Sequence, residues 1–171
     1  MPKDIGFSNY GKRFQESLAQ MILDDRPFAD QIEEVLDTQF FELKYLRVFV
    51  SKIYDYRRKY GVHPTKQILA SILRTELENH NDAVQKQVRD YFARTLIKSV
   101  DDQNYIKDTS LDFCKKQKLK EALMQSVDLI QNSSFEEVRR VIDDALKLGS
   151  DNDFGHDFLK DFQLRDLDLA S

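Results

Sequence analysis

Apolar residues recur three and four positions apart along most of this chain, which is the spacing of one face of an α-helix. The clearest apolar stripe consists of Leu43, Leu46, Phe49, Val50, Ile53 and Tyr54. The 171 residues include only five glycines and three prolines, so β-strands would lack turns to connect them. The pattern therefore predicts an all-α fold.

The first half of the chain is predicted to form short helices within one compact lobe, residues 1–80. A first helix starts near Phe14 and ends at the polar residues 24–27, and a shorter one follows. Gly61 ends the helix that carries the clearest stripe, and Thr65 is the expected N-cap of the next helix, because its hydroxyl can accept a bond from a free amide. The weakly patterned residues 79–82 mark the predicted lobe boundary.

The second half, residues 81–149, is predicted to form longer helices. Residues 84–97 form one, and the run from Asn104 to Gln131 forms another of about 28 residues, roughly 42 Å long. A short polar turn and a capping-box pattern at Ser134 and Glu137 start a further helix. Two long helices joined by a short turn make a protruding hairpin. Its exposed apolar stripe is predicted to be an oligomer interface formed by Leu119, Leu123, Val127 and Ile130.

Residues 150–171 read as a linker to a missing domain. Asp157 is placed to cap a new helix whose apolar residues are Phe158, Leu159 and Phe162. An amphipathic helix contributes stability only when its apolar face is buried, and nothing downstream is available to bury this one. These three residues are therefore expected to dock on a partner.

The composition narrows the class of protein. The chain is 41% hydrophobic and 33% charged, with a formal net charge of −4 and a single cysteine. It has no secretory signal and no apolar run near the ~18 residues of a membrane span. We therefore expect a cytoplasmic protein without membrane contact or an internal disulfide. The negative charge disfavours a dedicated, sequence-independent binder of nucleic acid, although local basic patches remain possible.

The sequence holds no convincing catalytic, cofactor or metal site. Residues 6–12 match the glycine and lysine spacing of a P-loop, but Arg13 replaces the magnesium-binding hydroxyl and too few residues precede Gly6 for a buried strand. The three histidines lack the spacing of metal ligands. Asp151 to Phe162 departs from a calcium loop, which needs a bidentate glutamate at its end. Cys114 is better explained as a partly buried helix residue than as a reactive thiol.

One segment allows a nucleic-acid contact. Tyr56 is followed by Arg57, Arg58 and Lys59, a combination suited to stacking bases and holding phosphates. The alternative is structural, because Tyr54 continues the core stripe and cations stabilise the C-terminal end of a helix. Both interpretations remain open at the level of sequence.

The order of these signals resembles a known family. The matching positions are Gln15, Leu18 and Met21 to Asp24, then Phe28, Phe40 and Phe41, the helix with Phe49 and Ile53, the joint Gly61 to Thr65, Leu69, and finally Phe154 to Asp161. Together they resemble the N-terminal domain of DnaB-like replicative DNA helicases. The last stretch is similar to the one that leads into the linker of the phage-encoded branch. The match extends from Phe14 onward and consists of hydrophobic patterns rather than a catalytic signature.

The resemblance implies a role in DNA replication within the primosome. Such helicases are hexameric rings in which a C-terminal motor domain uses ATP and magnesium to move along single-stranded DNA. Their N-terminal domains form a collar that has no ATPase chemistry and recruits primase. By this resemblance, residues 104–149 supply a hairpin that pairs between subunits, and residues 157–171 start a helix that docks on the neighbouring motor domain. The implied partners are further copies of the chain, primase and a helicase loader, in the cytoplasm of a bacterial host.

Two other functions remain possible. The chain could be a free-standing helical helicase loader or regulator, for which Ser171 would be the natural end. It could also be a small enzyme that uses Cys114 or a histidine. The reading frame beyond Ser171 separates the first alternative from the helicase interpretation, and a turnover assay that includes ATP hydrolysis tests the second.

Overall fold

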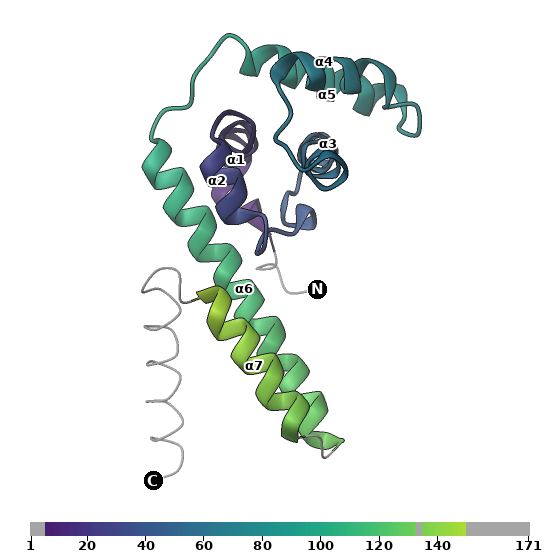
Figure 1. Cartoon of the computed structure of the whole chain (residues 1–171). Coiled ribbons are helices and arrows are strands. Elements are labelled where there is room, and N and C mark those ends of the chain that lie inside the picture. The colour runs from purple at the N-terminus through teal and green to yellow at the C-terminus, as the bar shows by residue number, and fades with distance from the viewer. Residues whose placement is uncertain (1–5, 133–134, 150–171) are drawn as a thin grey trace. The chain divides into compact units, whose positions relative to one another are not determined.

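The computed structural model describes residues 6–132 and 135–149, and every regular element in these residues is helical. The all-α prediction is confirmed. The elements are the 3-10 helices η1 (Phe7–Tyr10) and η2 (Thr38–Phe40) and the α-helices α1 (Gly11–Asp24), α2 (Arg26–Ile32), α3 (Lys44–Tyr60), α4 (Lys66–Thr75), α5 (Asp82–Thr95), α6 (Gln103–Gln131) and α7 (Phe135–Gly149). Figure 1 shows their order along the chain.

The chain divides into two compact units, Met1–Asp108 and Thr109–Ser171, and the division falls inside α6. Unit 1 is thus longer than the lobe of residues 1–80 expected from the sequence. The reason is that α5 contacts both α3 and α4, burying Val88, Tyr91 and Phe92 in the same core. The polar residues 79–82 form a turn within this core unit rather than a boundary.

Helix α3 lies at the centre of unit 1, where it contacts α1, α4, α5 and η2 (Figure 1). Its predicted apolar stripe is confirmed, because Leu46, Phe49 and Ile53 have no exposed surface. Phe49 meets the ring of Tyr91 from α5 edge-on, with 4.9 Å between the ring centroids. The buried stripe thereby joins helices that are far apart in sequence.

Local sequence signals fix several helix ends. Gly61 ends α3 in the left-handed region at φ 71°, a conformation that glycine adopts without steric cost. The Thr65 hydroxyl accepts a bond of 3.1 Å from the Ile68 amide and caps α4, as predicted. Asp25 separates α1 from α2 because its carboxylate accepts a bond from the Phe28 amide.

The segment with P-loop spacing forms part of the core. Phe7 is fully buried and packs against the rings of Phe14, Phe40 and Phe41. Gly6 lies so close to η2 that an added Cβ would be 2.6 Å from the Phe40 carbonyl oxygen. This glycine is therefore explained by close packing rather than by phosphate binding.

The end of α5 differs from the prediction. Residues 84–97 were expected to form one helix, but α5 ends at Thr95. Leu96 and Ile97 follow it in a turn, and Ile97 is 88% exposed. The Gln20 side chain donates to the carbonyl oxygens of Thr95 and Lys98, which holds this turn against α1.

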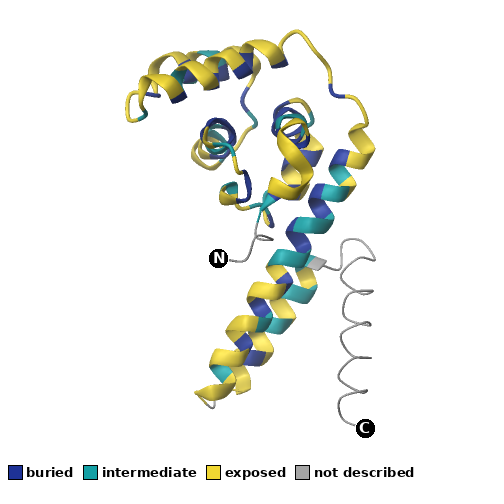
Figure 2. Cartoon of the chain, turned by 180° about the vertical axis from the view of Figure 1, so that it is seen from behind, coloured by how far each residue is buried: buried dark blue, intermediate teal, exposed yellow. Residues whose placement is uncertain are grey.

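Unit 2 contains the rest of α6 together with α7. These two helices lie side by side, as both views show (Figures 1 and 2). Buried positions recur along one side of α6 at Leu119, Ala122 and Ser126, and Val138 is buried on α7. The predicted pair of helices is thus present. Among the described residues, no helix is both long enough and apolar enough to cross a membrane.

Candidate functional site

The predicted interface stripe on α6 is divided by the hairpin. Leu119 is buried and Leu123 is half-buried, whereas Val127 and Ile130 are exposed. At about 100° per residue, Val127 lies roughly 80° around α6 from Leu119, whereas Ile130 lies only about 20° from it. Val127 thus turns away from the buried side of α6, whereas Ile130 stays on that side and is exposed next to the end of the helix.

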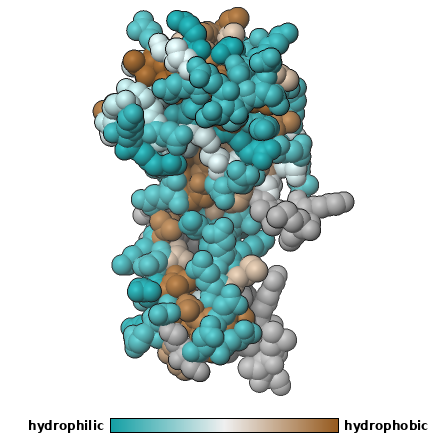
Figure 3. Space-filling model, turned by 90° about the vertical axis from the view of Figure 1, so that its right-hand side faces the viewer, coloured by the Kyte–Doolittle hydropathy of each residue, from teal (hydrophilic) through white to brown (hydrophobic). Residues whose placement is uncertain are grey.

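Two further large apolar residues near the same end of the hairpin are exposed, although Met124 lies about 120° around α6 from Ile130 and Phe135 belongs to α7. Met124 is 71% exposed, Val127 54%, Ile130 57% and Phe135 81%. We call these four residues the hairpin apolar face. On the side of the molecule drawn in Figure 3, apolar side chains lie scattered among hydrophilic ones. The sequence analysis did not single out Phe135, which is the first residue of α7. A group of large exposed apolar side chains is typical of an interaction surface.

The C-terminal end of α3 holds the residues predicted to contact nucleic acid. Arg58 is exposed and forms an ion pair of 3.2 Å with Asp55. The rings of Tyr56 and Tyr60 pack together with 4.7 Å between centroids, and the Lys59 ammonium lies over the Tyr60 ring. These aromatic faces are therefore partly used within the helix.

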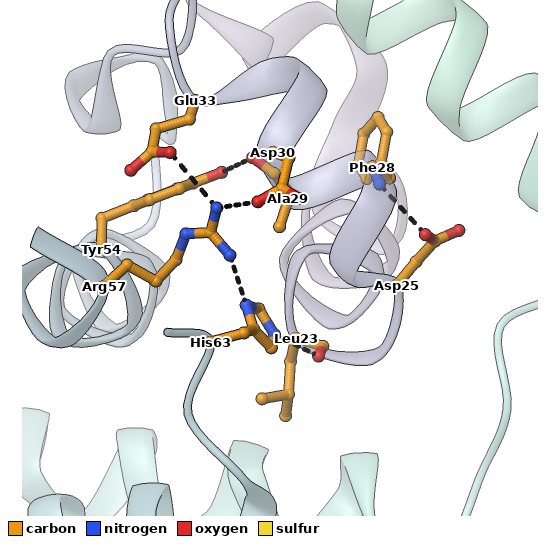
Figure 4. A network of polar contacts seen from close by, with 9 residues as sticks. All are labelled: Leu23, Asp25, Phe28, Ala29, Asp30, Glu33, Tyr54, Arg57 and His63. Atoms are coloured by element: carbon orange, nitrogen blue, oxygen red, sulfur yellow. Dashed lines mark hydrogen bonds and ion pairs between the residues drawn. The ribbon is translucent and has the colours of Figure 1, made fainter. Parts of the chain in front are cut away.

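Arg57 has a structural role instead of facing solvent. Its side chain is only 9% exposed, and its guanidinium pairs with the carboxylates of Asp30 and Glu33 on and just after α2 (Figure 4). Burial alone would lower the Arg57 pKa, but the hydrogen bonds and charges of the two carboxylates outweigh it, so the pKa is raised. The Arg57 guanidinium, which was predicted to hold phosphate, is thus already paired with carboxylates on and just after α2.

His63 completes the same network (Figure 4). Its Nδ1 accepts a bond of 2.8 Å from Arg57, and its Nε2 donates a bond of 2.8 Å to the Leu23 carbonyl. This pattern needs the neutral ring with the proton on Nε2. Burial lowers the His63 pKa, and the Arg57 charge adds to this effect although the bond to Leu23 opposes it. The histidine is a link between α1 and α3 rather than a metal ligand.

Unit 1 also contains an open cleft of about 1080 Å³ between η1, α1, the end of α5 and the start of α6. Its lining includes aromatic rings and basic side chains from segments that are far apart in sequence: Tyr10, Lys12, Arg13, Phe14, Arg94, Lys98 and Tyr105. Tyr10 stacks on Phe14 at 4.7 Å, and Tyr105 meets Phe14 edge-on at 6.5 Å. No motif in the sequence indicated this cleft, because it exists only when residues 9–20 meet residues 91–106.

Glu16 organises one wall of the cleft. Its carboxylate accepts bonds from Arg94 and from the Tyr45 hydroxyl, and the Tyr91 hydroxyl donates to its backbone carbonyl. Burial raises the Tyr45 pKa to about 12, and the negative charge of Glu16 contributes further. Both tyrosines therefore keep their protons at neutral pH and act as donors that hold α5 and α3 to α1.

The linker-docking residues Phe158, Leu159 and Phe162 lie outside the described residues, as does the predicted cap Asp157. Cys114 is buried within α6, which agrees with the expectation of a buried helix residue. Within residues 6–132 and 135–149, no group of three metal-binding side chains occurs.

Comparisons of the chain with protein-family models, with curated proteins and with solved structures return no match.

Proposed function

We propose that this chain is the N-terminal collar domain of a DnaB-like replicative DNA helicase of the phage-encoded branch, serving in ring assembly and in contact with primase. The motor domain that binds ATP and magnesium and moves along single-stranded DNA belongs to a further part of the same protein. In this proposal the chain itself performs no ATP hydrolysis. The resemblance of the sequence supplies the family, and the all-α fold is compatible with it.

The observation that carries the assembly role is the hairpin apolar face. Burying a large aliphatic or aromatic side chain stabilises a complex by about 1.5–3 kcal/mol, so a half-exposed one can still contribute about 1 kcal/mol. Val127 and Ile130 are both about half exposed. A symmetric contact buries each residue twice, once in each copy. A few side chains on this face can therefore stabilise a contact between two copies.

Primase contact is the second half of the proposal. A collar of several copies holds a bound primase near the template and raises its effective concentration there without new chemistry. The helices of unit 1 supply the outward surface in this scheme, while the hairpin forms the contact between copies.

Sedimentation equilibrium of the full chain tests the assembly role. We expect self-association that is weakened in the double variant Val127→Ser and Ile130→Ser. The loss of about 1 kcal/mol at each of four buried sites corresponds to roughly a thousandfold change in dissociation constant. The matched control is Val62→Ser with Ile68→Ser, because these residues are also exposed apolar side chains but lie in unit 1. A chain that remains monomeric, or that loses association equally in both variants, would contradict the role.

The gene sequence beyond codon 171 tests the helicase assignment separately. An open frame that continues into a P-loop with its magnesium-binding Ser or Thr supports the proposal. A stop codon directly after Ser171 would refute it and favour a free-standing helicase loader or regulator.

A further inference from the structure

The proposed function leaves the cleft of unit 1 without a role, yet its aromatic rings are accessible. Tyr105 is 61% exposed and Tyr10 is 39% exposed, while Phe14 between them is buried. The three rings form a continuous apolar floor on which large side chains of a partner could pack.

Four cations surround this floor: Lys12, Arg13, Arg94 and Lys98. Lys12 and Arg94 share the carboxylate of Glu16. Arg13 and Lys98 form no ion pair with any residue that the structure describes, so their charges face solvent at the rim. The other charged residues of the lining are Asp101 and Asp102. The cleft therefore suits a ligand that carries apolar groups together with charges of both signs, acidic groups for Arg13 and Lys98 and basic groups for Asp101 and Asp102.

The chain itself contains a segment with these properties. Residues 150–171 hold six aspartates but only Lys160 and Arg165 as positive charges. The apolar residues Phe154, Phe158 and Phe162 are spaced four apart, which predicts one apolar face if the segment is helical. Asp157 and Asp161 are also four apart and would flank that face.

We propose that the cleft binds this C-terminal segment of a second copy of the chain. Phe158 and Phe162 pack on the rings of Tyr10, Phe14 and Tyr105 in the docked state. The aspartates beside them pair with Arg13 and Lys98 at the rim. A nucleic-acid strand fits the cleft less well than this segment. Asp101 and Asp102 would repel the phosphates of a strand, whereas they can form ion pairs with Lys160 or Arg165.

This inference does not rest on the proposed function, since it requires only the cleft and the segment. The helicase resemblance assigns the same segment to a motor domain of a neighbouring subunit. The cleft would be a second docking place that holds the segment when that motor surface is not accessible.

A peptide-binding experiment tests the inference. The receptor is the full chain with Phe158→Ser and Phe162→Ser, so that its own segment does not compete. The probe is a fluorescently labelled peptide of residues 150–171, followed by anisotropy at low salt. We expect saturable binding that is weakened about tenfold or more by Arg13→Glu with Lys98→Glu. The matched control, Arg58→Glu with Lys59→Glu, makes the same charge change outside the cleft and should leave binding unchanged.

A charge exchange makes the test specific. A peptide with Asp157→Lys and Asp161→Lys should bind weakly to the receptor but regain affinity for the Arg13→Glu and Lys98→Glu variant. Tyr105→Ser, at an exposed ring, should weaken the unmodified peptide without altering the circular dichroism of the protein. The hairpin substitutions Val127→Ser and Ile130→Ser should not affect peptide binding, which separates this inference from the assembly role. Absence of saturable binding, equal losses in the cleft and control variants, or no recovery in the exchange would overturn the inference.

Discussion

Replacing Arg57 by methionine tests whether this residue is part of the fold or a surface contact. Methionine keeps most of the aliphatic stem but removes the guanidinium, which donates to Asp30, Glu33 and His63. The contacts connect α3 to α2 and to the joint before α4. The substitution therefore removes polar links in unit 1 while leaving the packing of the stem largely in place.

The expected loss of folding stability depends on how exposed the partners of Arg57 are. A hydrogen bond to a charged group contributes about 1.5–3 kcal/mol to stability. The bond to Asp30 is given no stabilising energy, because that carboxylate remains exposed to water. The energy of the bond to Glu33 is reduced, because the Glu33 side chain is 35% exposed. The substitution also removes the hydrogen bond that His63 accepts from Arg57. Together these losses should lower the free energy of unfolding of Arg57→Met by about 2 kcal/mol. The matched control Arg58→Met removes only an exposed pair with Asp55 and should cost less than about 0.5 kcal/mol.

Urea unfolding followed by tyrosine fluorescence is a suitable assay, because the chain has no tryptophan and all seven tyrosines lie between positions 10 and 105. The signal therefore reports unit 1 alone. The free energy of unfolding is compared between the unmodified chain, Arg57→Met and Arg58→Met. Equal effects of the two substitutions, or a change below about 0.5 kcal/mol for Arg57→Met, would refute the structural role of Arg57.

Two further predictions use the same assay. Because the His63 pKa is lowered in the folded state, its contribution to stability is present above the unfolded value of 6.5 and is lost as the pH falls. Between pH 7.5 and 5.5 the unmodified chain should therefore lose more stability than His63→Gln, and equal slopes would contradict the network. Gly6→Ala should cost about 1–3 kcal/mol because its Cβ meets the Phe40 carbonyl oxygen. The comparison is Gly61→Ala, which has no close neighbour and should cost only about 1 kcal/mol from its left-handed backbone; a reversed order would refute the packing argument for Gly6.

The features that could be predicted from the sequence are those set by residues close together in the chain. The stripe through Phe49, the glycine at the end of α3, the Thr65 cap and the long helix α6 are all encoded within a few turns of chain. A helical period and a cap residue are local signals, and local signals are sufficient to place these elements.

The remaining features depend on contacts between distant segments. Phe7 precedes Tyr10 and Phe14 at helical spacing, but its place in an aromatic cluster depends on Phe40 and Phe41, which are distant in sequence. Leu96 and Ile97 continue the spacing of α5, but the bonds from Gln20 to the turn end the helix before them. Arg57 has the same local setting as Arg58, and only the position of α2 separates a buried ion pair from an exposed one. The cleft likewise requires η1, α1 and α6 to meet.

In the proposed assembly, a second copy of the chain covers the hairpin apolar face. Met124 is a direct reporter, because it is 71% exposed in the single chain and its thioether is oxidised by peroxide when accessible. Mass spectrometry measures its oxidation rate at low and high protein concentration, with the buried Met21 as a control for unfolding. We expect Met124 to become protected as the concentration rises, and Val127→Ser with Ile130→Ser to abolish this protection. An oxidation rate that is the same at all concentrations, in a protein shown to self-associate, would contradict the proposed assembly.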